Sequence, residues 1–309
     1  MIKLIFMILL CTRILAASPG STSLSFLKID SGARASALAG AFSSYGNDAF
    51  AIFYNPSLGL NVDHHRIDIF HYEYFSDLRF ENLSGVFRVH DNYAIGLGLG
   101  YLYSGDILKT IRAENMEGYT ESGTFTTSDL LLLLSHSFRI SQNFISGIGI
   151  KYISETIDKQ TASTFALDIG VLYRVDLFIP MNIGLSLLNM GIPIQFVEKK
   201  ENLPFIIKAG FSFGLDPLRL NKKGKKDISF TFDFEKPSDN DLSCRLGSEL
   251  FFIDMFSVGL GYRYRFNQND LGDISFGAGI EINYFSINYA FVPYKYLGNT
   301  HRFSLGIKF

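Results

Sequence analysis

The stretch GARASALAGAFSSYGNDAFAIFYNPSLG, residues Gly32–Gly59, decides the fold of this chain of 309 residues. It is dense in glycine and alanine, and it contains one arginine, Arg34, one acidic residue, Asp48, and the dipeptide Asn55-Pro56. It carries no run of charge and no nucleophile beside a base. Because its side chains are small and a long series of predicted strands comes after it, we expect it to fold back inside a barrel formed by those strands.

Fourteen segments of alternating apolar and polar residues lie between this stretch and the end of the chain. Most have about the 9–11 residues that a tilted strand needs to cross a bilayer. They are Arg66–Tyr74, Glu81–Val89, Tyr93–Tyr103, Thr124–Ser137, Phe144–Ile153, Thr164–Arg174, Asn182–Asn189, Phe205–Leu215, Ile228–Glu235, Leu242–Leu250, Ser257–Phe266, Ile274–Glu281, Phe285–Phe291 and Arg302–Phe309. The sequence therefore predicts an all-β fold, a 14-stranded antiparallel transmembrane β-barrel with a small N-terminal plug, or hatch, inside the lumen.

The two faces of the predicted strands differ in chemistry. In Tyr93–Tyr103, bulky apolar residues alternate with alanine and glycine, and in Arg302–Phe309 they alternate with arginine, serine, glycine and lysine. In a secreted soluble β-protein, which is the alternative interpretation, the apolar face would point inward. Because many consecutive segments carry this face behind an export signal, we expect it to face lipid and the small or charged face to line the lumen.

The composition favours membrane strands over membrane helices. Apolar residues make up 47% of the chain and charged residues 19%, against a usual charged share of ~25%. No run of 18 apolar residues occurs after the N-terminus, which excludes helical spans. The 30 Phe, 16 Tyr and 28 Gly favour strands and tight turns, and two cysteines are too few for a disulfide framework.

The first residues resemble an export signal. Lys3 supplies a positive start, LIFMILL an apolar core, and Leu15-Ala16-Ala17 a cleavage site. We therefore expect a signal peptide over residues 1–17, the plug over 18–65 and the outer-membrane barrel over 66–309.

Glycine is concentrated on the predicted lumen face, for example at Gly96, Gly98, Gly147 and Gly184. A strand glycine weakens a sheet unless another backbone approaches closely or the wall must bend. A wall lined with glycine leaves room for a bulky object, and the Gly32–Gly59 segment is the simplest candidate. Bending of the wall is a second role for the same residues, and we expect both.

Arg34 is the candidate pin of the plug. A guanidinium enclosed in the lumen needs a carboxylate partner. Asp48 is a candidate, and so are inward-facing acids of the wall such as Asp168, Asp233 and Glu281. A structural role in holding the plug and a role in ligand binding are both open for Arg34.

The C-terminal half of the plug carries signals for a short helix and its exit. Asn47 or Asp48 is expected to cap a helix over Ala49–Tyr54. Pro56 then fixes the exit, because the proline pushes Asn55 out of the helical region.

Two leucines break the polar pattern of the lumen. In the run that starts at Asp129, Leu131 and Leu133 share the face of that aspartate and are expected to point inward. Such an apolar pair either packs on the plug or lines a path for an apolar ligand. The glycine-rich strand beside it, Tyr93–Tyr103, is the part of the wall that bends most easily.

The search for catalytic groups predicts a protein that is not an enzyme and has no cofactor. The segment Gly210–Gly214 matches GxSxG, but that motif requires a strand-to-helix elbow and here it lies inside a predicted strand. The adjacent residues His64 and His65 cannot face one metal site from a strand. Without Lys3 and Arg13 the 28 basic residues become 26 against 30 acidic ones, and this net charge of −4 argues against nucleic acid as a partner.

The connections between predicted strands alternate in length. Those after even-numbered strands are short, such as His90–Asn92, and those after odd-numbered strands include the longest, Ser104–Gly123 and Met190–Pro204. Short periplasmic turns and longer outer loops are typical of outer-membrane barrels. Asp216–Asp227, which contains NKKGKK, is a long basic exception, either a solvated turn or a docking patch for a periplasmic partner. We expect the outer loops to be too short to grip a protein domain.

The N-terminal motif resembles the signature of the PorV/PorQ family, whose members are similar to FadL-type fatty-acid transporters. The matching positions are Gly32, Ala33, Arg34, Ala39, Gly40, Ala41, Phe42, Asp48, Ala49, Asn55, Pro56 and Leu58. The chain departs from the family pattern at Ala39, Asn47 and Ser57-Leu58-Gly59. The C-terminal sequence NYAFVPYKYLGNTHRFSLGIKF also resembles the family's ending, so the likeness covers nearly the whole expected mature chain.

The resemblance implies a fourteen-stranded barrel with an N-terminal hatch in the outer membrane of a diderm bacterium, inserted by the barrel-assembly machinery. It leaves three functions open, and the third of them is a purely structural barrel. The favoured expectation is passive uptake of hydrophobic, fatty-acid-like molecules. The alternative is a type IX secretion accessory that hands protein cargo to a surface sortase.

Overall fold

The computed structural model describes residues 19–112, 118–176, 178–196, 198–216, 227–252, 254–266, 272–295 and 298–309. The expected signal peptide and the NKKGKK turn lie outside these residues. Fourteen of the described strands build the wall of a barrel. They are β1 Arg66–Glu73, β2 Arg79–His90, β3 Tyr93–Tyr103, β6 Thr127–Ser141, β7 Phe144–Ile157, β8 Gln160–Val175, β9 Met181–Gly191, β12 Ile206–Leu215, β13 Ile228–Pro237, β14 Ser243–Phe252, β15 Phe256–Arg265, β16 Asp273–Ile282, β17 Phe285–Tyr294 and β18 Gly298–Lys308.

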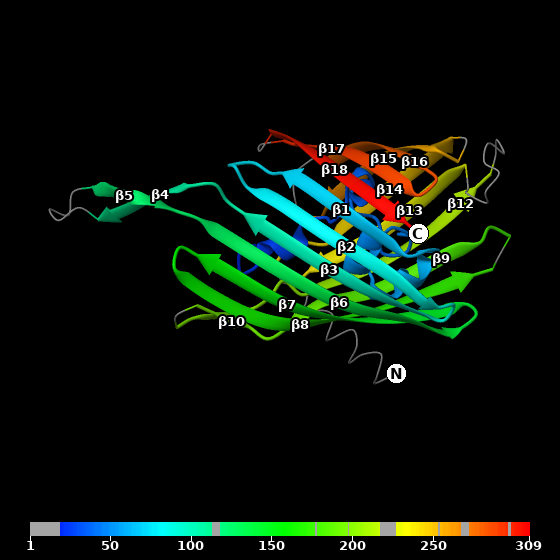
Figure 1. The fold of residues 1–309 in the computed structure, drawn as a ribbon, viewed down its shortest axis with the longest axis horizontal. Coiled ribbons are helices and arrows are strands. Elements are labelled where there is room, and N and C mark those ends of the chain that lie inside the picture. Colours follow the sequence, from blue (N-terminus) through cyan, green and yellow to red (C-terminus); the bar gives the residue numbers. More distant parts are fainter. Residues whose placement is uncertain are drawn as a thin grey trace.

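These strands form one closed antiparallel sheet in which each barrel strand pairs with the next along the chain and β1 pairs with β18 (Figure 1). The predicted all-β, 14-stranded closed barrel is confirmed, and each of the fourteen predicted segments falls on one of these strands. The bounds of β3 are those predicted. No helix among the described residues is long and apolar enough to cross a membrane.

The wall alternates as its sequence predicts. Along β3 the tyrosine, isoleucine and leucine side chains from Tyr93 to Tyr101 are exposed, and Ala94 and the three glycines between them are buried. In β18, Phe303 and Leu305 are exposed and Ser304 is buried. The lipid side therefore takes the bulky apolar residues and the lumen takes the small ones.

The N-terminal segment fills the lumen with short turns of helix. These are η1 Ser25–Lys28, α2 Ala33–Ala37, η2 Ala49–Phe53 and η3 Pro56–Asn61. Figure 1 shows them inside the ring of strands. Helix α2 contacts β15 to β18, and η3 contacts β6, β7 and β8 on the other side of the wall. The segment therefore spans the lumen from wall to wall.

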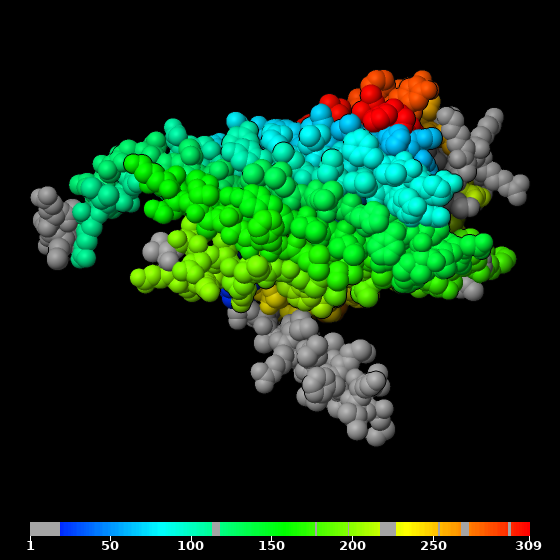
Figure 2. Space-filling view, turned by 60° about the horizontal axis from the view of Figure 1, so that its bottom comes forward, coloured from blue at the N-terminus to red at the C-terminus, as the bar shows by residue number. Residues whose placement is uncertain are grey.

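The two ends of the barrel differ. At one end, called here the hairpin end, the connection from β3 to β6 forms a hairpin of β4 Ile107–Arg112 and β5 Tyr119–Phe125, and β10 Ile194–Gln195 pairs with β11 Lys200–Glu201. The β4–β5 hairpin projects past the rim of the barrel (Figures 1 and 2). The Ser104–Gly123 connection is folded into strands, and our expectation that the outer loops are too short to grip a protein domain stays a prediction.

The opposite end, called here the Arg66 end, holds the start of β1 and the end of β18. The plug connects the two ends. Near the hairpin end Thr22 forms a β-bridge to Asn202, and near the Arg66 end Asn61 accepts a hydrogen bond of 3.0 Å from Arg174. Since the longer loops of such barrels face outward, the hairpin end is the extracellular end and the Arg66 end is periplasmic.

Deletion of Arg302–Phe309 should abolish folding of the barrel. The β1–β18 pairing runs from Arg66–Lys308 to Tyr72–Arg302, so its loss leaves unpaired backbone groups that lipid cannot hydrogen-bond. The measurement is heat-modifiable migration of the truncated protein in outer membranes. A truncated chain that still migrates as a folded, heat-sensitive band would contradict closure of the wall through β18.

Candidate functional site

Inward glycines let the plug lie directly on the wall. A Cβ added at Gly184 would come within 2.3 Å of the Ser43 carbonyl oxygen, and one at Gly147 would come within 2.3 Å of the carbonyl carbon of Pro56. The inward glycines at which an added Cβ would lie within 3.2 Å of a plug atom are Gly96, Gly98, Gly147, Gly170, Gly184, Gly210, Gly247, Gly259, Gly261 and Gly277. Close approach is therefore the main reason for glycine on this face.

Hydroxyl groups of the wall hydrogen-bond the plug backbone. Ser137 donates to the Pro56 carbonyl at 2.6 Å, a typical bond of this set. The same kind of bond joins Ser84 to Ala49, Ser186 to Tyr54, Ser212 to Ser44, Thr231 to Ala41 and Ser275 to Ala37. These bonds satisfy carbonyl groups that short 3-10 turns leave without partners in the plug.

Two acidic residues of the wall accept hydrogen bonds from plug amides. Asp233 accepts from the backbone N–H groups of Phe42 and Ser43 at 3.0 and 2.8 Å. Asp68 accepts from the Ala49 N–H at 2.7 Å. All three hydrogen bonds are buried, so the wall fixes both the position and the orientation of the plug backbone.

Arg34 is held by Glu249 of β14. The Arg34 Nε donates to Glu249 Oε1 at 2.9 Å and Nη2 donates to Oε2 at 2.7 Å, a two-pronged contact. Tyr45 donates its hydroxyl to the same carboxylate at 2.7 Å, and Arg34 Nη1 donates to Asn47. The two charged side chains are 14% and 3% exposed, so the pair is largely desolvated and joins plug to wall.

Asp48, one of the predicted acids, forms a long ion pair with Arg34, but the closer partner, Glu249, was not among those named. Asp48 lies 3.9 Å from the guanidinium, while Asp168 pairs with a lysine of β7, Asp233 holds plug amides and Glu281 pairs with Lys308. Glu249 lies two residues after the inward Gly247, and that alternation is a sequence signal that could have identified it.

Asp48 also has a local role in the plug. Its side chain accepts a hydrogen bond of 3.1 Å from the Phe50 N–H and caps η2, as expected for this position. Burial, with the nearby carboxylate of Asp68, raises the pKa of Asp48 to about 6. The carboxyl is therefore partly neutral at mildly acidic pH, and Glu249 supplies the main countercharge of Arg34.

Asn55 and Pro56 fix the turn between η2 and η3. The Asn55 side chain donates to the carbonyl groups of Ser43 in the plug and Val171 in β8, at 2.9 and 3.0 Å, and accepts from the Ser57 N–H at 3.0 Å. Asn55 is fully buried against the wall. The Asn-Pro dipeptide thus locks the plug chain to β8.

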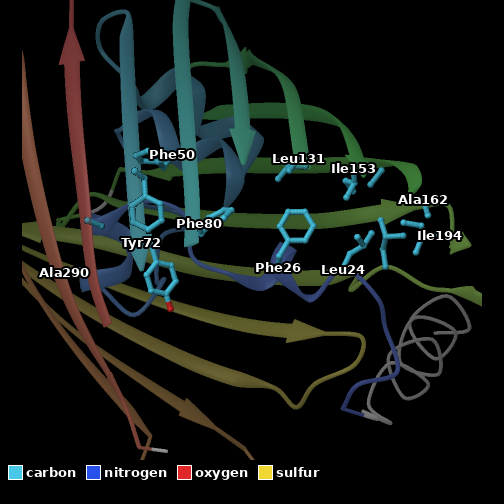
Figure 3. Close-up of a cluster of buried hydrophobic side chains, with 14 of the residues drawn as sticks. Leu24, Phe26, Phe50, Tyr72, Phe80, Leu131, Ile153, Ala162, Ile194 and Ala290 are labelled. Atoms are coloured by element: carbon cyan, nitrogen blue, oxygen red, sulfur yellow. The ribbon is translucent and has the colours of Figure 1, made fainter. Parts of the chain in front are cut away.

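Leu131 and Leu133 point into the lumen, as the alternation predicts, and the plug covers them. They are 5% and 3% exposed. Leu131 belongs to an apolar cluster with Phe26 of the plug and Phe80 of β2, and Figure 3 shows Phe26 lying between Phe80 and the side of the cluster that holds Leu24. The cavity beside Leu131 has a volume of about 40 Å³, far below the ~300–1,000 Å³ of ordinary ligand sites.

The glycine-rich strand β3 does not open the wall. It pairs with β6 without interruption from Tyr93–Phe138 to Tyr103–Ser128, and with β2 apart from one irregularity near Arg88. At its middle, a Cβ on Gly98 would lie 2.4 Å from the ring of Phe53 of the plug. The wall therefore stays closed at β3, and the ring of Phe53 occupies the space beside Gly98.

The motifs considered for catalysis have structural surroundings. Ser212 of the GxSxG match lies within β12 and donates its hydroxyl to the Ser44 carbonyl at 3.0 Å. The ring of His65 lies between those of Phe87 and Phe309, with centroids 6.2 and 5.5 Å away. Neither residue has the arrangement that nucleophilic or metal chemistry requires.

The chain matches the family model "Type IX secretion system membrane protein PorP/SprF" over residues 119–307. It belongs to this family. The match lies entirely within the barrel and covers more than half of the chain, and the fold is that of a FadL-like barrel. The family model names PorP/SprF, whereas the N-terminal motif resembles PorV/PorQ. No curated protein sequence matches the chain.

Solved structures show where the fold is shared. The toluene transporter TodX of Pseudomonas putida has a TM-score of 0.64 at 10% identity, with 90% of this chain and 98% of that chain covered. The toluene transporter TbuX of Ralstonia pickettii has a TM-score of 0.60 at 11% identity, covering 90% and 98%. A FadL homologue of Pseudomonas aeruginosa has a TM-score of 0.55 at 12% identity, covering 89% and 97%. The PorP/SprF protein is thus an outer-membrane β-barrel of a diderm bacterium.

Gly147→Ala should displace the plug, whereas Gly149→Ala should not. The new methyl at residue 147 meets the backbone of Pro56 and Ser57, which cannot move aside. At residue 149, on the same face of β7, it meets side-chain atoms of Leu133 and Asp168 no closer than 3.1 Å. We expect Gly147→Ala to cost about 1–3 kcal/mol in unfolding free energy. Equal losses from the two variants in denaturant unfolding would contradict tight seating of the plug.

Arg34→Ala should loosen the plug and raise ion conductance in planar bilayers. It leaves Glu249 buried without its partner, at a cost of about 3–5 kcal/mol. Lys308→Ala, which breaks the partly exposed pair with Glu281, should cost about 0–1 kcal/mol and leave conductance unchanged. Equal conductance of Arg34→Ala and the wild-type protein would show that this pair does not keep the lumen closed.

Proposed function

We propose that this outer-membrane barrel is a component of the type IX secretion machinery that acts on protein cargo or its handling proteins, with its lumen sealed by the plug. The division of the chain into a cleaved signal at residues 1–17, a plug at 18–65 and a barrel at 66–309 is part of this proposal. The observation that carries it is the membership of residues 119–307 in the PorP/SprF family.

The state of the lumen supports the proposal. Leu131 and Leu133, the candidate lining of an apolar path, are buried in apolar clusters with plug residues, and the cavity beside Leu131 has a volume of only about 40 Å³. Uptake through this barrel would require the plug to release the buried Arg34–Glu249 pair and the amides held by Asp233. A closed lumen is consistent with a membrane component that binds other proteins and does not conduct small molecules.

The outer surface supports it as well. The β4–β5 hairpin and the β10–β11 pair lie at the extracellular end, so the chain offers a folded surface above the membrane. Protein cargo is therefore not excluded by a lack of outer surface. Handing cargo to a surface sortase is the more specific form of this role.

One observation favours the second candidate function, passage of a hydrophobic compound. An apolar groove of about 530 Å³ lies on the lipid side of β2, β3, β6 and β7, with Gly98 and Leu133 among its lining residues. It lies outside the point where Phe53 meets Gly98. A lateral exit at this place would require both a displacement of Phe53 and a parting of the ladder between β3 and β6.

Deletion of the gene in its own bacterium should stop surface delivery of proteins secreted by the type IX route and leave them in the periplasm. Restoring the wild-type gene should restore delivery. Proteoliposomes that carry the folded protein should accumulate no more long-chain fatty acid than empty controls.

The opposite pattern would overturn the proposal in favour of uptake. It consists of unaffected secretion, fatty-acid accumulation above empty controls, and loss of that accumulation when Leu131→Asp and Leu133→Asp are combined. Heat-modifiable migration of the double variant shows whether the barrel has assembled.

A further inference from the structure

The β4–β5 hairpin is a sheet of two strands that no other described strand joins. Nearly all of its residues are exposed, and Figures 1 and 2 show it projecting beyond the barrel rim. An isolated two-stranded hairpin is at best marginally stable in water, and it gains stability from a third strand or a packed face. The described part of the chain supplies neither.

The base of the hairpin is held on two sides. The Gly105 N–H donates to the Asp77 carbonyl in the β1–β2 turn at 3.2 Å. Lys109 forms an ion pair with Asp158 in the β7–β8 turn. These contacts set the direction in which the hairpin leaves the barrel, so its edges are presented at a defined place above the membrane.

The two edges of the hairpin differ. The register moves from the pair Leu108–Thr124 to the pair Thr110–Glu121, so β5 contains an extra residue. Gly123 in this bulge has a φ of +82°. A bulge blunts an edge against further pairing. Strand β4 has no bulge of its own and no proline, and it is the edge open to another strand.

The chemistry of β4 indicates what would pair with it. Leu108 and Ile111 are 51% and 50% exposed on opposite faces of the strand. The charged residues of β4 are both basic, Lys109 and Arg112, and Arg112 is exposed near the tip. Lys109 is already paired with Asp158, so a complementary strand has apolar residues on both faces and an acidic residue opposite Arg112.

We propose that the free edge of β4 binds one extended strand of another protein at the cell surface, apolar on both faces and acidic opposite Arg112. Main-chain hydrogen bonds supply the affinity and the side chains of β4 select the sequence, as in other cases of strand addition. The proposal rests on the proposed function in that the secretion role brings proteins to this side of the membrane.

Binding is tested with a defined probe and the full-length protein in lipid nanodiscs. The probe is a synthetic hexapeptide with valine opposite Ile107, Leu108 and Ile111, threonine opposite Lys109 and Thr110, and glutamate opposite Arg112. Its control has proline at two of the valine positions. The probe should slow amide hydrogen exchange at least tenfold within Ile107–Arg112. Within Tyr119–Phe125, the amides that do not hydrogen-bond to β4 should exchange at an unchanged rate. No change in β4, or equal protection by the proline peptide, would overturn the proposal.

A matched pair of variants locates the edge. Leu108→Glu with Ile111→Glu places two negative charges on β4, and Thr124→Glu with Thr120→Glu places two on the residues directly across the ladder. The β4 variant should weaken probe binding at least tenfold and the β5 variant less than threefold. Equal effects of the two variants would assign binding to general charge rather than to the β4 edge.

The same two variants in cells separate this proposal from the proposed function. Secretion lost on gene deletion and in the β4 variant, but kept in the β5 variant, supports both. If secretion is lost on gene deletion but kept in both variants, the β4 proposal alone is overturned. If deletion leaves secretion unaffected, the proposed function is overturned, and the nanodisc experiment still shows whether the β4 edge binds a strand. A wild-type dimer that becomes monomeric when residues 107–125 are deleted would assign the edge to a second copy of this chain.

Discussion

The plug can remain in this barrel only because the wall supplies the hydrogen bonds that the plug backbone does not make within itself. The plug consists of short 3-10 turns and one helix of five residues, so many of its amide and carbonyl groups have no internal partner. In a lumen closed to water, an unpaired backbone group costs about 1–3 kcal/mol. Serine and threonine hydroxyls of the wall donate to the carbonyl groups, and Asp233 and Asp68 accept from the amides.

This requirement explains the composition of the inner wall. A hydroxyl can reach a plug carbonyl only if the neighbouring inward residue is small enough for the plug to lie close by. On β7 and β6, Gly147 lies on Pro56 while Ser137 donates to the Pro56 carbonyl, and the two residues are direct ladder partners. On β12, Gly210 lies against Ser43 and Ser212 donates to the Ser44 carbonyl. Glycine lets the plug backbone come close to the wall, and serine donates the hydrogen bond to the plug carbonyl.

Features that depend on periodicity were predictable from the sequence, and features that depend on pairing in three dimensions were not. Alternation in Tyr93–Tyr103 was enough to assign both faces of β3, and the same rule pointed Leu131 inward. For Arg34 the sequence pointed to Asp48, which forms the longer ion pair. The closer partner, Glu249, was missed because several inward acids compete and only the register of β14 brings Glu249 to Arg34. The β4–β5 hairpin was missed because its strands are short and β5 is interrupted by a bulge, so they show no clear period.

The course of the plug also constrains how the barrel forms. The segment enters near Asn202 at the hairpin end, crosses the whole lumen, and leaves at the Arg66 end to begin β1. Passing such a segment through a finished, closed barrel would require threading it along the whole lumen, and chains avoid threading. The plug must therefore lie between the strands before β18 pairs with β1. The small residues of the wall serve this step as well, because the strands close around the plug with little side-chain volume to displace.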